Sequence, residues 1–326
     1  MNNKLSDENE DLHVENDSVK LIENNETIEP SIANMENPLV KANEEYIKNN
    51  PGLYYERFDG VSRFTHVLII VSFLSLALTG MIIKFSGVPA FQFLSRLFGG
   101  YEITGFIHRV AAIITFIYFS LHIIYLFRKK NHLNISLKEL VFGKYSMIPN
   151  KNDLIQLLQT LKWFLGLGPR PEYGRWTYWE KFDYFAVFWG VTIIGSSGLL
   201  LWFPEFFTNL GVPGSLINIA TIIHSDEALL AAGFIFTIHF YNTHFRPDKF
   251  PIDTVIFTGT VDIEELKYDR PVEYSEFIQS ENVRKYLKPK PQKFFIRLSK
   301  IFGFTALILG MSIIITIIYS MLFLYK

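Results

Sequence analysis

The chain of 326 residues contains no cysteine. Disulfide bonds, cysteine-bound iron–sulfur clusters and covalently attached c-type haem all require thiols, so the sequence excludes all three from this chain. Any redox cofactor that the chain binds must therefore be held by other side chains.

Charged residues are also scarce, at 19% of the chain against roughly 25% in an average soluble domain. The deficit is concentrated in five stretches without Lys, Arg, Asp or Glu: Phe64–Ile83, Val110–Phe127, Tyr184–Pro204, Ala228–Phe245 and Ile301–Tyr325. Each is about long enough to cross a hydrocarbon core of roughly 30 Å as a helix. The composition excludes a soluble enzyme and predicts an all-α integral membrane protein.

Lysine and arginine are distributed unevenly between the loops, and cytoplasmic loops are those that retain positive charge. The segments Arg128–Asp183 and Arg246–Lys300 carry ten and eleven of these residues, whereas Glu205–Ser225 carries none and Lys84–Arg109 carries three. We therefore predict five crossings of a bacterial inner (cytoplasmic) membrane. The N-terminus is then cytoplasmic, and the C-terminal Lys326 is periplasmic.

The start of the chain is acidic, with 12 acidic and 4 basic residues among residues 1–50. It is poor in aromatic residues, so we expect it to bury too little apolar surface to fold. The predicted organisation is a disordered acidic tail at 1–52, a four-helix bundle at 53–257, a cytoplasmic connector at 258–297 and a fifth transmembrane helix at 298–326. The four bundle helices are predicted at about 64–83, 104–127, 184–203 and 217–243.

One inner loop has the pattern of an amphipathic helix. Asn152 and Asp153 suit a helix start. The apolar residues that follow at helical spacing are Leu154, Ile155, Leu157, Leu158, Leu161 and Leu165. Trp163 and Phe164 suit the headgroup zone, so we predict an interfacial helix on the membrane surface, although a helix that docks on a partner would have the same pattern.

Six of the eight histidines lie in the predicted helices or at their ends: His66, His108, His122, His224, His239 and His244. An imidazole is costly in hydrocarbon, so each needs a partner. The predicted orientation places His108 and His224 near the outer surface. His66, His122 and His239 then lie near the inner surface, and His244 lies at the inner boundary.

The spacing of these histidines predicts two levels of ligands. His108 and His122 are 14 residues apart, which is about 21 Å of rise and roughly −40° of rotation, so both face one direction. His224 and His239 are 15 apart, which gives about 22.5 Å and roughly +60°, a difference that a π-bulge or a supercoil could close. Two helices thus offer imidazoles at matching depths. The arrangement suits two stacked haem groups, each held between histidines of different helices.

Small and cationic residues accompany the histidines. Gly80, Gly105, Gly190, Gly195, Gly198 and Gly233 could let a flat macrocycle approach the backbone, although glycine in membrane helices also serves ordinary packing. Arg63, Arg109 and Arg128 lie near helix ends, where they could pair with haem propionates or extend to the lipid headgroups.

The sequence resembles the diheme cytochrome b membrane subunits of respiratory formate dehydrogenases and nickel–iron hydrogenases over roughly Arg57–Phe257. The resemblance rests on four sets of residues in order: Arg63-Phe64-Thr65-His66 with Leu78-Thr79-Gly80, Phe98-Gly99-Gly100 then Ile107-His108, Leu200-Leu201-Trp202-Phe203-Pro204, and Ile222-Ile223-His224 with His239-Phe240-Tyr241. It implies an outer haem on His108 and His224, an inner haem on His66 and His239, and a menaquinone site beside the inner haem.

The chain departs from this family pattern in three places. His122 is additional at the inner level, where it could replace an inner ligand or mark a third haem or a quinone. The spacing in the fourth helix is one residue longer than the family pattern, and the fifth helix is extra. Cytochrome b/b6-domain proteins that accompany multihaem c-type cytochromes are more similar to this chain, and their pattern better accommodates His122 and the segments Trp179–Asp183 and His239–His244.

Asp226 and Glu227 are two carboxylates just past His224, toward the membrane interior, where ionised groups are rare and usually functional. Glu227 is three residues from His224 and therefore near its face. As a hypothesis, Glu227 takes or passes a proton near the outer haem. The alternatives are an acceptor that orients a ligating imidazole and a helix that starts deeper in the membrane.

These patterns predict a membrane cytochrome b that passes electrons between a quinone pool, menaquinone or ubiquinone, and a redox partner through two b-type haems, with a third possible. Quinone chemistry moves protons as well as electrons, and His122, His239 and His244 are candidates for that role. No other cofactor motif is present, so the other end of the path must be another polypeptide. We expect an extracytoplasmic iron–sulfur or multihaem cytochrome subunit, and no nucleic acid.

Two other functions are compatible with membrane histidines. One is a transporter or channel that uses them, with Asp226 and Glu227, as a path for protons or metal ions. The other is a structural anchor that binds no haem and whose histidines only pack.

Overall fold

The computed structural model of the protein describes residues 37–132, 134–143 and 146–324. Within these ranges, five helices are long and apolar enough to cross a membrane. They are α3 (Gly60–Lys84), α5 (Tyr101–His132), α8 (Tyr178–Trp202), α10 (Gly214–Phe234) and α15 (Lys293–Tyr319). α10 continues into the π-helical turns η2 (Ile235–His239) and η3 (Tyr241–Phe245), and α15 continues into η4 (Ser320–Leu324). The predicted all-α membrane architecture is confirmed.

Several of these helices begin earlier than their uncharged runs, because polar caps and a polar first turn precede the apolar residues. α3 begins at Gly60, and the Ser62 N–H donates to the Asp59 carboxylate that caps it (2.7 Å). α8 begins at Tyr178 behind a capping box of Thr177 and Glu180. These caps satisfy backbone N–H groups that have no partner inside the helix.

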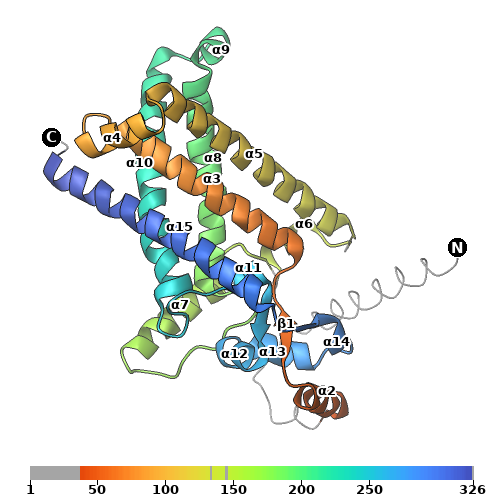
Figure 1. Ribbon diagram of the computed structural model, residues 1–326. Coiled ribbons are helices and arrows are strands. Elements are labelled where there is room, and N and C mark those ends of the chain that lie inside the picture. The colour runs from red at the N-terminus through yellow and green to blue at the C-terminus, as the bar shows by residue number, and fades with distance from the viewer. Residues whose placement is uncertain (1–36, 133, 144–145, 325–326) are drawn as a thin grey trace, which may run out of the picture.

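The helices form two hairpins (Figure 1). α3 packs along α5 and the short helix α4 (Pro89–Leu97) joins them, whereas α8 packs along α10 with α9 (Pro204–Asn209) between them. α5 and α8, from different hairpins, are in contact over a much shorter length. α15 packs against α3 and η2, and a core of Phe, Ile, Leu and Met side chains fills this junction.

A small folded unit, here called the cap, lies at the end of the bundle where α3 and α8 begin (Figure 1). Its sheet has the order β2-β1-β3, and both pairs of strands are antiparallel. Its elements are α2 (Pro38–Asn49), β1 (Leu53–Glu56), α11 (Val255–Thr258), β2 (Thr260–Asp262), α12 (Ile263–Asp269), α13 (Pro271–Ile278), α14 (Val283–Tyr286) and β3 (Leu287–Pro289). The sequence did not predict this sheet. Because β1 is its central strand, the predicted division at residue 257 cuts through one folded unit.

The predicted disordered tail at 1–52 is wrong for residues 37–52, and residues 1–36 lie outside the described residues. α2 buries Val40 against the cap, and its Asn43 amide donates to the carbonyl oxygens of Ile278 and Ser280 (2.9 and 3.0 Å). These partners lie more than 230 positions further along the chain. The composition of residues 1–50 could not predict that α2 folds, because the surface that stabilises α2 comes from the other end of the chain.

The predicted amphipathic helix is α7 (Lys151–Phe164), which follows the short helix α6 (Leu137–Phe142). Its cap is Asn150 rather than Asn152, and Asp153 completes a capping box. Asp153 also forms a buried ion pair with Lys181 of α8 (3.0 Å), which holds α7 to the bundle. The apolar side chains of α7 are largely exposed, among them Leu154, Ile155, Leu158 and Leu161. Their position at the membrane surface stays a prediction.

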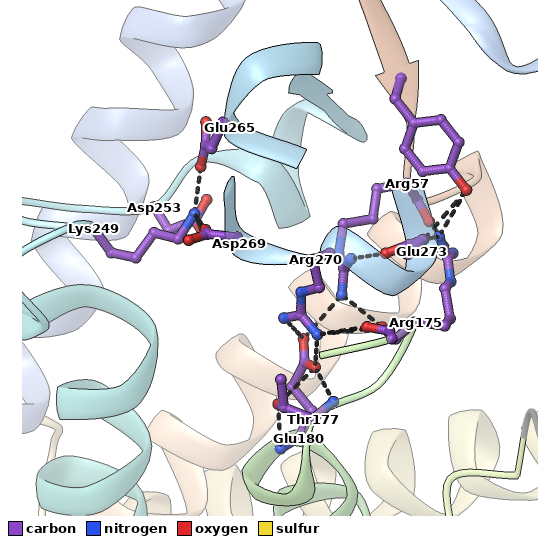
Figure 2. A network of polar contacts seen from close by, with 12 residues as sticks. Arg57, Arg175, Thr177, Glu180, Lys249, Asp253, Glu265, Asp269, Arg270 and Glu273 are labelled. Atoms are coloured by element: carbon purple, nitrogen blue, oxygen red, sulfur yellow. Dashed lines mark hydrogen bonds and ion pairs between the residues drawn. The ribbon is translucent and has the colours of Figure 1, made fainter. Parts of the chain in front are cut away.

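An ionic network joins the cap to the start of α8 (Figure 2). The Glu180 carboxylate accepts hydrogen bonds from Arg57 of the chain after β1 (3.1 Å) and from Arg270 (2.8 and 3.0 Å). Glu273 accepts from Arg57 (2.7 Å) and from Arg175 (2.5 Å). Burial alone would lower the pKa of Arg57, but the two glutamates raise it on balance. Arg57 therefore stays charged, and the network ties three segments that are distant in sequence.

A second ionic cluster lies within the cap, around Lys249 (Figure 2). Its ammonium group contacts Asp269 (2.6 Å), Asp253 (3.7 Å) and Glu265. Burial raises the pKa of Asp269, but Lys249, Arg246 and Arg170 together lower it by more, so the pKa lies below its ordinary value. This cluster fastens the loop after η3 onto α12.

Candidate functional site

A cavity of about 2570 Å³ lies between the hairpins and reaches the cap. Its lining comes from α3, α5, α8, α10 and the cap, and most of it is apolar. Pockets for a single ligand are typically about 300–1,000 Å³, so this cavity has room for more than one large ligand. All six histidines that the sequence singles out line it: His66, His108, His122, His224, His239 and His244.

His108 of α5 and His224 of α10, here called the outer pair, face each other across the cavity. Their ring centres are 6.2 Å apart, and the ring planes are inclined by 71°. An imidazole nitrogen lies about 2 Å from a bound first-row metal ion, so two rings on opposite sides of one ion have centres roughly 6 Å apart. The outer pair thus has the separation that one shared metal ion requires.

Hydrogen bonds determine which ring nitrogen of the outer pair is free. The Thr79 hydroxyl donates its proton to the Ser75 carbonyl (2.5 Å), so it accepts from Nδ1–H of His108 (2.9 Å). The Ile194 carbonyl can only accept, so His224 also donates from Nδ1 (2.9 Å). In both rings Nε2 then carries the lone pair, and a lone pair is what a metal ligand needs.

Glycines lie directly behind both rings. A Cβ atom built on Gly198 would lie 2.9 Å from Cε1 of His224, and one on Gly80 would lie 3.3 Å from Cε1 of His108. The two glycines therefore provide space for the imidazoles themselves. Gly105 differs from them, because it does not line the cavity and a Cβ there would meet nothing within 4 Å.

The inner level contains His239 and His66. Nδ1 of His239 donates to the Asp183 carboxylate of α8 (2.8 Å), which again leaves Nε2 with its lone pair. His66 lies within electrostatic range of His239 and His244, and its ring forms no hydrogen bond with the described part of the chain. A carboxylate behind an imidazole is the usual support of a metal-binding histidine.

His122 and His244 differ from the ligand candidates in the hydrogen bonds that their ring nitrogens form. Nε2 of His122 is hydrogen-bonded to the Tyr184 hydroxyl of α8 (2.9 Å). Nδ1 of His244 accepts from the backbone N–H of Asp253 (3.3 Å), so its proton is on Nε2. In these arrangements both rings suit proton exchange better than metal binding.

The register of the fourth membrane helix is altered by the π-turns. A π-turn takes one more residue than an α-turn, so a 15-residue spacing with one π-turn rotates roughly as 14 residues of α-helix do. η2 ends at His239, and His224 and His239 both line the cavity. The structure therefore contains a π-turn between His224 and His239. This is one of the two features, a π-bulge or a supercoil, that could explain their 15-residue spacing.

The predicted arginines do not share one position. Arg109 lines the cavity, and its guanidinium lies 6.0 Å from the Trp202 ring. Arg63 donates to the Phe257 carbonyl (2.7 Å) and does not line the cavity. Arg128 is exposed and also outside it. Of the three, the structure places only Arg109 where a haem propionate could reach it.

The two carboxylates of α10 are also separated. Asp226 is exposed and contacts Lys84 at the end of α3 (3.3 Å). Glu227 lines the cavity, and the indole N–H of Trp189 donates to it (3.4 Å). The geometry is compatible with a proton role for Glu227 and separates Asp226 from the cavity.

Sequence reasoning missed the residues that orient the rings: Thr79, Asp183 and Tyr184. Asp183 precedes His239 by 56 positions on another helix, so no local motif connects them. A signal was present nonetheless. Asp183 directly precedes the uncharged run Tyr184–Pro204, so a carboxylate at the end of a membrane helix could have been singled out.

The donor set fits a b-type haem. His108 and His224 would hold its iron through their free Nε2 atoms, and their ring separation would leave room for one ion between them. In the described residues, no group of three or more His, Cys, Asp or Glu side chains is placed to hold a bare metal ion.

Comparison with known proteins gives one family. A family model described as prokaryotic cytochrome b561 matches residues 57–246, which is more than half of the chain. No curated protein matches the chain.

Proposed function

The chain belongs to the prokaryotic cytochrome b561 family, and from this premise we propose that it carries electrons between a quinone and a redox partner through two b-type haems. Membership itself makes the protein a membrane cytochrome b of electron transfer, with b-type haem as its cofactor. Such cytochromes typically work with partner subunits. The number of haems, their ligands, the quinone and the partner are the proposal.

His108 and His224 are proposed to hold the outer haem. The main support for this assignment is the separation of 6.2 Å between the two ring centres. In both rings, Nδ1 forms a hydrogen bond with the protein, so Nε2 is free. A bound haem supplies one-electron redox chemistry at its iron. The chain contributes the orientation of both rings and a mostly apolar cavity around them.

His66 and His239 are proposed to hold the inner haem. His239 has the same free Nε2 as the outer ligands, and His66 is the cavity histidine that no described group engages through a hydrogen bond. The Nε2 atom of His122 is already bonded to Tyr184, and this disfavours His122 as the inner ligand and disfavours a third haem on it.

His122, Tyr184 and His244 are proposed to handle the protons of a quinone, either menaquinone or ubiquinone. Oxidation of a quinol releases two electrons and two protons, so the site needs groups that can accept a proton beside the electron acceptor. His122 and Tyr184 form a hydrogen-bonded pair on the cavity wall, and both lie on the inner half of their helices. His239 is not included, because Asp183 already engages it.

The remaining assignments concern the surroundings of the chain. We propose a bacterial inner membrane, with the N-terminus cytoplasmic and the C-terminus periplasmic, because of the lysine and arginine distribution. The partner is proposed to be an extracytoplasmic iron–sulfur or multihaem cytochrome subunit, because the chain has no cysteine and no second cofactor motif.

Haem quantification tests the proposal. The pyridine haemochrome of the purified full-length protein is expected to show two haems per chain, and His224→Ala is expected to remove one. His122→Ala is the matched control, because it removes a cavity histidine of the same kind while both haems should remain. A wild-type protein without a reduced-minus-oxidised haem spectrum would refute the proposal. A loss of haem in His122→Ala would reassign the inner site.

A further inference from the structure

The π-helical end of α10 contains His239 and His244. The N–H of Phe240 donates to the Ile235 carbonyl, five residues back, and the N–H of Arg246 donates to the Tyr241 carbonyl in the same way. π-turns are rare and occur often at functional sites, because they change the direction of the side chains that follow. The side-chain direction of His239 therefore depends on what holds η2 in this conformation.

One side of the π segment is held by α8. The Asp183 carboxylate accepts the hydrogen bond of the His239 ring, and this contact acts on the imidazole directly. This contact acts on the His239 ring and not on the backbone of η2. A second contact acts on side chains of the π segment itself.

The second contact is with α15, at Gly310. A Cβ atom built there would lie 2.6 Å from Cδ1 of Phe236 and 2.8 Å from Cε2 of Phe240. Both rings are nearly inaccessible, with 1% and 7% of their surface exposed, so neither can move aside freely. These two phenylalanines flank His239 in the sequence, and the rings of Phe240 and His239 are 6.3 Å apart. Glycine at position 310 thus makes the space into which the π segment packs.

α15 lies outside the part of the chain that the family model matches, residues 57–246. It runs across α10 and beside α3 (Figure 1), and it is in contact with η2. The added helix therefore packs at the segment whose ligand spacing is also unusual. The two departures from the family pattern meet in space.

We propose that α15 positions His239, through the close contact of Gly310 with Phe236 and Phe240. Gly310 is a positioning residue and not a ligand. This inference rests on the proposed inner haem, for which His239 is a ligand.

α15 also offers an internal control. Gly303 is seven residues earlier on the same helix, and it packs against Ile252 and Phe257 instead of the π segment. A substitution at Gly303 disturbs the docking of α15 without contact with the residues that flank His239. It therefore separates a local effect on the ligand from a general loosening of the helix.

The experiment measures the two haems separately in purified full-length protein, by potentiometric titration and by their low-spin electron paramagnetic resonance signals. Gly310→Val is expected to shift or remove the inner signal, with a loss of up to half of the bound haem, and to leave the outer signal in place. Gly303→Ala is expected to change neither signal. Gly310→Ala should produce a smaller shift of the inner signal in the same direction.

A compensating substitution covers the case in which Gly310→Val does not fold. Phe236→Leu removes one of the two close contacts and leaves the contact with Phe240, so Gly310→Ala combined with Phe236→Leu should restore part of the inner signal that Gly310→Ala shifts. An unchanged inner signal in both Gly310 variants, an equal effect of Gly303→Ala, or failure of the double variant would overturn the inference. A wild-type protein with no haem would instead refute the proposed function.

Discussion

The outer pair and the inner level use the same side chain in two different settings. His108 and His224 donate to uncharged oxygens, a threonine hydroxyl and a backbone carbonyl, and their rings pack against glycines. His239 donates to a carboxylate, and it follows a π-turn that packs on α15. The outer site is thus built from the hairpin helices alone, whereas the inner site also needs a negative charge and an added helix.

The difference has an electrochemical consequence. A carboxylate behind an axial imidazole increases its basicity, which favours the oxidised, more positive iron. The inner haem is therefore expected to have the lower reduction potential of the two. A change at one level should leave the other unchanged, and this separation can be tested.

The largest effect is expected at the outer pair, with Gly198→Ala. The added Cβ would lie 2.9 Å from Cε1 of His224, so the ring must move and lose its hydrogen bond to Ile194. We expect loss of the outer haem and retention of the inner one, measured by haem content and spectra. Gly105→Ala is the control, since its Cβ would meet nothing within 4 Å. Equal haem loss in both variants would contradict the outer assignment.

Next in size is Asp183→Asn at the inner level. Removal of such a supporting carboxylate typically lowers metal affinity about 10–100-fold. We expect weaker retention of the inner haem and a higher potential for the fraction that remains, because the negative charge is gone. Potentiometric titration measures both effects. Thr79→Val is the matched change at the outer pair, because it removes an uncharged hydrogen-bond partner of His108. A shift of the outer potential in Asp183→Asn would show that the two levels are not independent.

A smaller effect is expected from Tyr184→Phe, which removes the hydrogen bond to His122 and keeps the ring. A net hydrogen bond contributes about 1 kcal/mol, so we expect quinol oxidation to slow by about fivefold. Both haem signals should stay unchanged, because Tyr184 supports no proposed ligand. Rates with a soluble quinol analogue measure the change. Unchanged turnover would remove the pair from the quinone site.

The smallest effect concerns acid and the cap. The pKa of Asp269 lies below its ordinary value of 3.8, because Lys249, Arg246 and Arg170 together outweigh the effect of burial. The stabilisation is therefore fully present above that value and is lost as pH falls through the pKa of the folded state. As pH falls below 3.8, the inner haem signal should broaden before the outer one, since the cap adjoins the inner level. Asp269→Asn should be less stable at neutral pH and lose less on acidification. Simultaneous changes at both levels would contradict this order.

The membrane helices could be predicted because their evidence is local. An uncharged run of sufficient length marks a membrane helix wherever it occurs, and helical spacing alone places His108 and His122 on one face. The predicted ends of the helices were less accurate, since capping residues such as Asp59 and Thr177 lie outside the apolar runs. The fold of α2 was missed because its partners are at the other end of the chain.

By itself, the sequence determined that this protein has helices able to cross a membrane and that the chain supplies no thiol to a cofactor, and it predicted imidazoles at two depths. Those properties follow from composition and helical periodicity, which act between near neighbours in the chain. Only the tertiary structure decided which ring nitrogen is free, that Asp183 supports His239, and that Gly310 of α15 makes room for the π segment. These are contacts between segments far apart in sequence, and they exist only once the helices have packed.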